Sequence, residues 1–167
     1  MSERRHPNVV AETEASVSEF ARGEKYSEKR RQLAQAAGGE RLGCSLYEVP
    51  PGKTAWPRHY HLGNEEAVYV LSGAGTVTIG EDAIAVSAGD YIALPAGEKH
   101  AHQLVNTGTE PLRYLCMSTM AEPDIVVYPD SNKLGLFAGS APGGPREQRT
   151  FGAFVDNAAR VDYWKGE

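Results

Sequence analysis

The sequence predicts an all-β domain, an antiparallel barrel or sandwich, from three features: short apolar runs, closely spaced turn residues and the lack of long helical patterns. From residue 42 onward, the apolar runs are separated by clusters rich in glycine and proline, which are typical of turns between strands. We expect the strands to be Leu42–Val49, Ala55–His61, Glu66–Leu71, Thr76–Ile79, Ala83–Val86, Tyr91–Leu94, His100–Asn106, Leu112–Ser118 and Asp124–Tyr128.

The predicted domain organisation is a single barrel with an extension at each end. A chain of 167 residues is long enough for one domain with a sizeable core. Residues 1–41 form a polar arm, with a short helix over 28–37 that Gly38-Gly39 would end. Residues 42–138 form the barrel. Residues 139–167 form a tail, which we expect to dock on the barrel through its apolar end, residues 161–164.

Composition excludes several classes of partner. The net charge of -5 argues against nucleic acid and anionic membranes, because both attract concentrated basic patches. No apolar stretch is long enough to span a bilayer, and the polar start does not resemble a signal peptide. Cys44 and Cys116 are far apart in the sequence, and we expect both to be buried, reduced thiols. We therefore expect a cytoplasmic protein whose partner is a small molecule.

Four of the five histidines lie in two pairs, His59/His61 and His100/His102. Side chains two residues apart in a strand share a face, so each pair presents two imidazoles in one direction. Burying two neutral polar rings side by side is costly unless both have a partner, and a metal ion supplies one. A carboxylate from Glu65 or Glu66 would add a hard, charged ligand.

The stretch from Pro51 to Gly73 resembles the first conserved motif of the cupin superfamily. That motif has a glycine, then H-x-H, then a glutamate, then a second glycine, and here it implies His59, His61 and Glu66 as metal ligands. Glu66 stands six residues before Gly73, the motif spacing, so the resemblance selects it over Glu65. Glu65 should then face solvent.

The second cupin motif resembles the stretch that begins at Gly89 and contains Pro95-Ala96-Gly97, but here the sequence allows two registers. Counting forward from Gly97 selects His100 as the fourth ligand, whereas counting back from Asn106 selects His102. We favour His102, because its spacing to Asn106 lies on a strand of fixed register, while loops tolerate extra residues.

The resemblance extends to small bacterial single-domain cupins over roughly residues 25 to 167, and it implies a double-stranded β-helix, or jelly roll. Three histidines and one glutamate are compatible with Mn, Fe, Co, Ni or Zn and leave positions open for a ligand. The resemblance suggests a metal-dependent isomerase or lyase acting on a small oxygenated acid or sugar-like molecule. An iron-dependent dioxygenase and a non-catalytic small-ligand binding protein remain alternatives.

Two further expectations follow. If His100 shares the face of His102 nearer the barrel mouth, it could act as the catalytic acid and base, since imidazole titrates near neutral pH. The alternative is that His100 is a loop residue whose side chain faces solvent.

Exposed edge strands and a polar arm suggest a homodimer, because cupins commonly pair their sheets across a two-fold axis.

Overall fold

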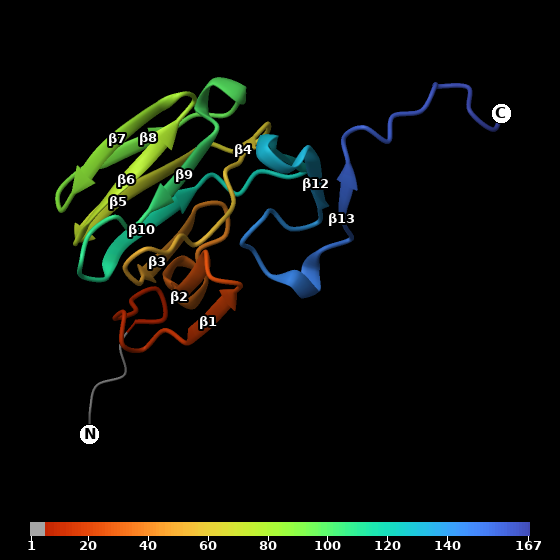
Figure 1. Cartoon of the computed structure of the whole chain (residues 1–167). Coiled ribbons are helices and arrows are strands. Elements are labelled where there is room, and N and C mark those ends of the chain that lie inside the picture. Colours follow the sequence, from red (N-terminus) through yellow and green to blue (C-terminus); the bar gives the residue numbers. More distant parts are fainter. Residues whose placement is uncertain (1–5) are drawn as a thin grey trace.

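Strands are the main secondary structure of the protein, as the sequence predicts (Figure 1). The computed structural model describes residues 6–167, so the first five residues of the predicted arm fall outside the described range. The strands are β1 (Val17–Arg22), β2 (Tyr26–Gln32), β3 (Gly43–Val49), β4 (Tyr60–His61), β5 (Glu66–Ser72), β6 (Ala74–Ile79), β7 (Asp82–Ser87), β8 (Tyr91–Leu94), β9 (His102–Val105), β10 (Leu112–Ser118), β11 (Asp124–Tyr128), β12 (Lys133–Ala138) and β13 (Phe151–Asp156). Within residues 6–167, no helix has the length and apolar character needed to cross a bilayer.

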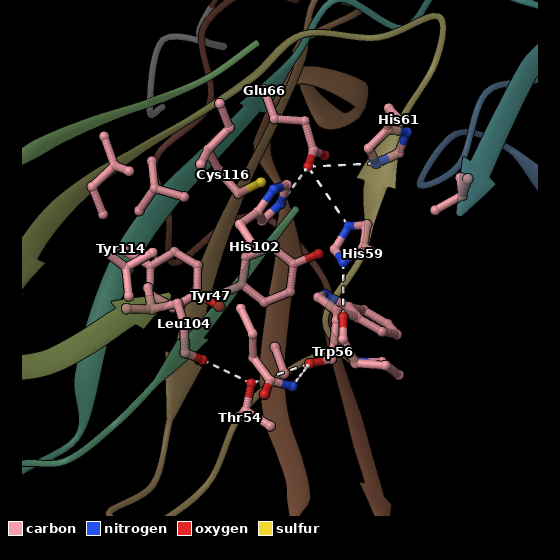
Figure 2. A pocket seen from close by; sticks show the side chains of 18 of the residues that line it. Tyr47, Thr54, Trp56, His59, His61, Glu66, His102, Leu104, Tyr114 and Cys116 are labelled. Carbon is pink, nitrogen blue, oxygen red and sulfur yellow. Dashed lines mark hydrogen bonds and ion pairs between the residues drawn. The ribbon is translucent and has the colours of Figure 1, made fainter. Parts of the chain in front are cut away.

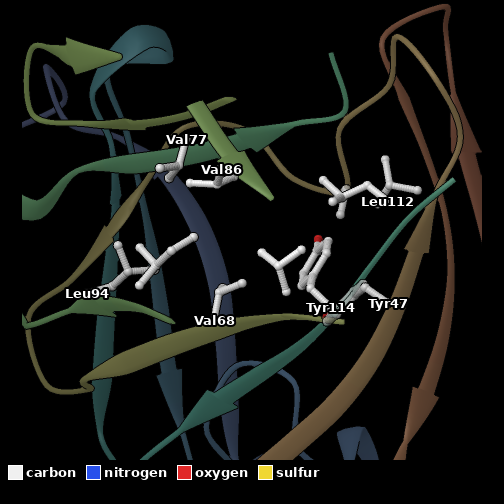
Figure 3. Packing of buried hydrophobic residues seen from close by; sticks show 11 residues of the cluster. Tyr47, Val68, Val77, Val86, Leu94, Leu112 and Tyr114 are labelled. Atoms are coloured by element: carbon white, nitrogen blue, oxygen red, sulfur yellow. The ribbon is translucent and has the colours of Figure 1, made fainter. Parts of the chain in front are cut away.

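The strands form three antiparallel sheets. The largest has the order β1-β2-β3-β10-β5-β8, a second has the order β7-β6-β9, and a third has the order β13-β12-β11-β4. The first two face each other and enclose the hydrophobic core, where Val77 and Val86 lie opposite Val68 and Tyr114 (Figure 3). Neighbouring strands distant in the sequence, such as β5 and β10, give the crossed connections of a jelly roll.

The alternation of buried and exposed residues shows which face of the large sheet points inward. On β5, Val68 and Val70 are buried, whereas Tyr69 between them is exposed. Their cross-strand partners on β10, Cys116 and Tyr114, share the inner face. This period of two is the pattern from which the barrel is predicted.

The N-terminal arm differs from the prediction. The first half of the helix expected over 28–37 belongs to strand β2, which pairs with β3, and the helix α1 is a single turn over Leu33–Ala36. The free edge of β3 offers a ladder of hydrogen bonds that outweighs the weak helical propensity of this stretch. The helix does end where glycine predicts: the N–H of Gly39 donates to the carbonyl of Ala34.

The stretch 55–61 and the tail also depart from expectation. Only Tyr60–His61 forms a strand in the first, and residues before it contribute isolated bridges. In the tail, β13 pairs along the whole of β12, so the tail docks through a strand that the sequence analysis did not anticipate. Its aromatic end does not pack on the part of the chain that the structure describes, because Tyr163 and Trp164 are 84% and 70% exposed.

Candidate metal centre

His59 and His102 lie opposite each other in an antiparallel bridge. The N–H of His59 donates to the carbonyl of His102 at 3.0 Å, and the N–H of His102 donates back at 2.8 Å. β4 then carries the chain to His61, which pairs with Val126 on β11. Because residues two apart in an extended chain share a face, His59 and His61 present their rings to the same space.

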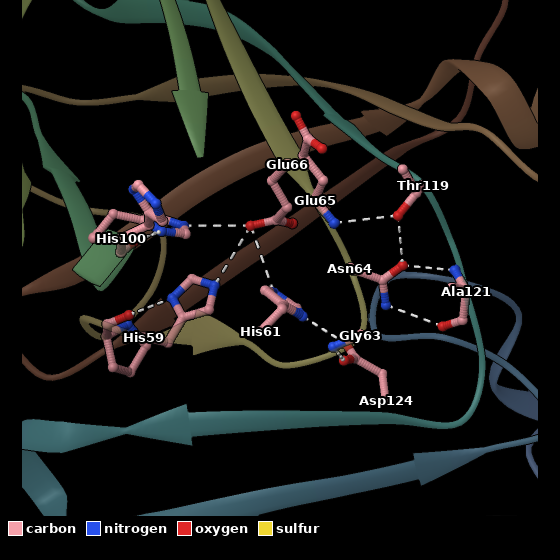
Figure 4. A network of polar contacts seen from close by, with 12 residues as sticks. His59, His61, Gly63, Asn64, Glu65, Glu66, His100, Thr119, Ala121 and Asp124 are labelled. Carbon is pink, nitrogen blue, oxygen red and sulfur yellow. Dashed lines mark hydrogen bonds and ion pairs between the residues drawn. The ribbon is translucent and has the colours of Figure 1, made fainter. Parts of the chain in front are cut away.

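Glu66, the first residue of β5, completes the group. Its Oε2 lies 3.8 Å from His59 Nε2 and 3.4 Å from His61 Nε2 (Figure 4). It lies 3.3 Å from His102 Nε2 (Figure 2). The structure therefore brings all four residues predicted from the two motifs together. Glu65 is exposed, as expected, and its backbone N–H donates to Thr119 Oγ1.

The second nitrogen of each histidine is also bonded. His59 Nδ1 lies 2.8 Å from the carbonyl of Pro57, and His102 Nδ1 lies 2.9 Å from the carbonyl of His100. A carbonyl only accepts, so each Nδ1 carries a proton, and the neutral form of each ring has its lone pair on Nε2, on the side of Glu66. This arrangement prepares both rings to act as Nε2 ligands.

Asp124 holds the third histidine, and sequence analysis missed it. Its Oδ2 lies 2.5 Å from His61 Nδ1, and its Oδ1 accepts the N–H of Gly63 at 3.0 Å. The carboxylate is fully buried at the start of β11. A carboxylate behind a ligating imidazole fixes the ring and raises its basicity, a recurring arrangement in metal sites.

Asn64 fixes the loop that carries these groups. Its side chain donates to the carbonyl of Ala121 at 3.0 Å and accepts hydrogen bonds from Thr119 Oγ1 and the N–H of Ala121. It is 1% exposed. The loop between His61 and Glu66 is thus clamped to the segment that leads into Asp124.

Burial and neighbouring charges set the protonation of the cluster. Burial, together with the adjacent His102, lowers the pKa of His59 to about 4. Burial also disfavours a charged His61, but its hydrogen bonds to Asp124 and Glu66 outweigh burial and raise its pKa to about 9. Burial alone would raise the pKa of Glu66, yet hydrogen bonds from His102 and His61 hold it well below its usual value.

These donors suit a divalent transition metal. The ligand atoms of His59, His61 and Glu66 all lie within 4.8 Å of one another, and His102 Nε2 adjoins them. Ligand atoms that share one ion through bonds of about 2.1 Å lie roughly 3 to 4 Å apart. Imidazole and carboxylate together match Mn, Fe, Co, Ni and Zn. The group therefore fits a metal ion.

A cavity of about 200 Å³ opens beside the four side chains (Figure 2). Much of its wall is apolar, including Val68, Ile92 and Leu94 from the inner face of the large sheet. Its aromatic lining includes Tyr47, Trp56, Tyr114 and Tyr128. Tyr69 and Tyr91, by contrast, are exposed.

His100 does not follow strand alternation. It ends the 3₁₀ turn Glu98–His100 (η1), which begins after Gly97 at φ +109°, and β9 starts only at His102. Its side chain is not among those that line the cavity beside the four ligands. Its carbonyl, rather than its ring, contributes to the site by accepting from His102.

Comparison with known proteins agrees with this geometry. The family model described as the cupin domain matches residues 45–118. A suggested sugar phosphate isomerase from Acidithiobacillus ferrooxidans is 33% identical, over 81% of this chain and 80% of that one, with a TM-score of 0.69. The chain belongs to the cupin superfamily. The family resemblance and the jelly-roll fold expected from the motifs are both confirmed.

Other similar cupins carry different activities in their names. A sugar phosphate isomerase from Silicibacter pomeroyi is 25% identical, with a TM-score of 0.68, over 83% of this cupin and 82% of that chain. Quercetin 2,3-dioxygenase from Bacillus subtilis is 29% identical over 59% of this cupin but only 30% of its own length. The chain spans 54% and 30% of the lengths of two curated relatives that it matches.

Proposed function

We propose that this cupin is a metal-dependent isomerase or lyase that acts on a small oxygenated acid or a sugar-like molecule. The observation that carries the proposal is the convergence of three Nε2 atoms on Glu66 Oε2 beside a cavity. A bound divalent cation would polarise a carbonyl oxygen of the ligand and favour enolisation. The isomerase names of two similar structures support the same reaction class.

The residues around the site have separate roles in this proposal. His59, His61 and His102 supply nitrogen ligands, and Glu66 supplies the negative charge that offsets part of the cation's charge. The apolar wall excludes water, which strengthens electrostatic interactions inside the cavity. The ring of His100 does not line the cavity, so its expected role as proton carrier is not part of this proposal.

An iron-dependent dioxygenase is the alternative function. The match to quercetin 2,3-dioxygenase favours it, and the same set of three histidines and one glutamate can hold iron.

A cytoplasmic location remains part of the proposal. It is supported by the free thiols of Cys44 and Cys116, because cytosolic proteins are kept reduced.

Oxygen dependence separates the two reactions. We expect protein loaded separately with Mn, Fe, Co, Ni or Zn to convert small hydroxy-carbonyl acids or sugars at the same rate with and without oxygen. The measurement is product formation under air and under nitrogen, with His61→Ala protein as the metal-depleted control. Turnover that requires both iron and oxygen would replace the isomerase with the dioxygenase. Tight binding without turnover would establish a binding protein.

We also propose a homodimer whose interface uses the arm. Every residue of β1 is exposed, and β1 occupies one edge of the large sheet. An exposed edge strand has unpaired backbone groups that a second copy can satisfy. We expect light scattering at micromolar concentration to report a dimer for the full chain and a monomer after deletion of residues 1–24, which leaves β2 in place. A monomeric full chain, or an unchanged dimer after the deletion, would contradict this.

A further inference from the structure

The strand β2 carries polar side chains onto the inner face of the large sheet. Arg30 pairs with Tyr47 on β3, and Gln32 pairs with Ser45. Cross-strand partners lie on the same face of a sheet, and so do residues two apart in one strand. Glu28, two residues before Arg30, therefore lies on this inner face as well. The sheet therefore turns every second residue of this charged stretch toward the interior.

Arg30 is held in a fixed position on that face. Its Nε donates to Ser45 Oγ at 3.0 Å, and its guanidinium carbon lies 5.6 Å from the centre of the Tyr47 ring. Its Nη2 donates to the carbonyl of Gly143 at 3.1 Å, and Gln32 Nε2 donates to the same carbonyl at 2.7 Å. Two donors from neighbouring positions of β2 thus converge on one acceptor oxygen.

Among the described residues, the charge of Arg30 has no ion-pair partner. Within residues 6–167, no carboxylate lies within ion-pair distance of its guanidinium. The nearest acid on its own strand face, Glu28, is 4% exposed, and burial raises its pKa to about 7 even though Arg30 opposes the shift. Glu28 therefore keeps its proton to higher pH than an ordinary glutamate and is only partly ionised near neutral pH.

Arg30 and Gln32 line a second cavity of about 460 Å³. This polar chamber lies next to the metal-site cavity, because Tyr47, Glu66, Cys116 and Pro142 line both. Two further acids, Glu40 and Glu147, line the chamber but are exposed. A ligand that reaches the four metal-binding side chains can extend past Glu66 toward the guanidinium of Arg30.

We propose that the ligand of this cupin is an anion whose phosphate or carboxylate group is bound by Arg30 and Gln32 in the polar chamber, while oxygen atoms at its other end reach the metal centre. An oxygen of the anion takes the acceptor position that the Gly143 carbonyl now occupies. That carbonyl belongs to an exposed loop residue, so water can take over as its partner. Arginine is the residue best suited to binding carboxylate and phosphate. The inference rests on the proposed function, because it names the substrate class of the same site.

The test compares ligands that do or do not carry a second anionic group. Metal-loaded protein is titrated calorimetrically with 2-phosphoglycolate, with succinate and with glycolate, which lacks the second group. We expect 2-phosphoglycolate or succinate to bind at least about ten times more tightly than glycolate, since a hydrogen-bonded charge pair contributes that much. The tighter of the two identifies phosphate or carboxylate as the group that is bound.

The variant Arg30→Gln should reduce this preference to about twofold or less, and Gln32→Ala should reduce it by a smaller factor. Arg31→Gln is the matched control: it removes the same charge one residue away on the opposite face and should keep the preference. Equal affinities for the three ligands in the unaltered protein, or an unchanged preference in Arg30→Gln, would overturn the proposal. Titration of inorganic phosphate into metal-free protein tests the anion site separately from the proposed metal-dependent function. Phosphate binding that is lost in Arg30→Gln would support the anion site even if the protein binds no metal.

Discussion

We expect His59→Ala, His61→Ala and His102→Ala each to lower the affinity for the metal by more than about a hundredfold. Each change deletes one ligand from a set of four, and even the loss of a partner behind a ligand costs about 10- to 100-fold. Glu66→Gln should weaken binding less, because an amide oxygen can still coordinate. The measurement is competition with a chelator of known affinity, combined with thermal unfolding to show that each variant folds.

His100→Ala is the control for this series. It deletes an imidazole two residues from His102 but keeps the backbone carbonyl that accepts from His102 Nδ1 at 2.9 Å. We expect it to keep the affinity of the unaltered protein within about twofold. Full affinity in His102→Ala together with loss in His100→Ala would reverse the assignment of the fourth ligand.

The second large effect is expected at Asp124. Asp124→Asn should lower metal affinity by about 10- to 100-fold, the usual cost of losing a carboxylate behind a ligating histidine. An amide has one accepting oxygen, but Asp124 now accepts from both His61 Nδ1 and the N–H of Gly63. If the NH₂ group faces His61, Nδ1 must accept, so the proton moves to the Nε2 that would bind the metal.

A surface aspartate provides the matched control for Asp124→Asn. Asp130 pairs with Arg58 at 3.2 Å and is well exposed, so Asp130→Asn makes the same chemical change away from the cluster. Chelator competition should leave the Asp130→Asn protein unchanged. Equal affinities of the two variants would show that Asp124 has no part in holding His61 for the metal.

The four metal-binding side chains could be predicted because the motifs that contain them are short stretches of sequence. His59 and His61 are two apart, Glu66 follows within a short loop, and the strand spacing from His102 to Asn106 sets the second register. Asp124 could not be found this way, because 63 residues separate it from His61 and only the pairing of β4 with β11 brings them together.

The helix prediction is wrong over residues 28–32 for a related reason. Residues 28–37 have helical propensity, but the free edge of β3 pairs with residues 29–32, and local propensity carries no information about that edge. Once β2 is a strand, Arg30 faces the chamber instead of solvent. The error about one strand therefore concealed a candidate ligand-binding residue.

The metal content of the unaltered protein tests the central claim most directly. The protein should be expressed and purified without a histidine tag or a nickel column, and then examined by elemental analysis alongside His61→Ala. We predict about one divalent transition metal ion per chain in the unaltered protein, and less than about a tenth of that in the variant. Equal metal contents in the two proteins, or no metal in the unaltered protein after incubation with Mn, Fe, Co, Ni or Zn, would contradict a metal centre at His59, His61, Glu66 and His102.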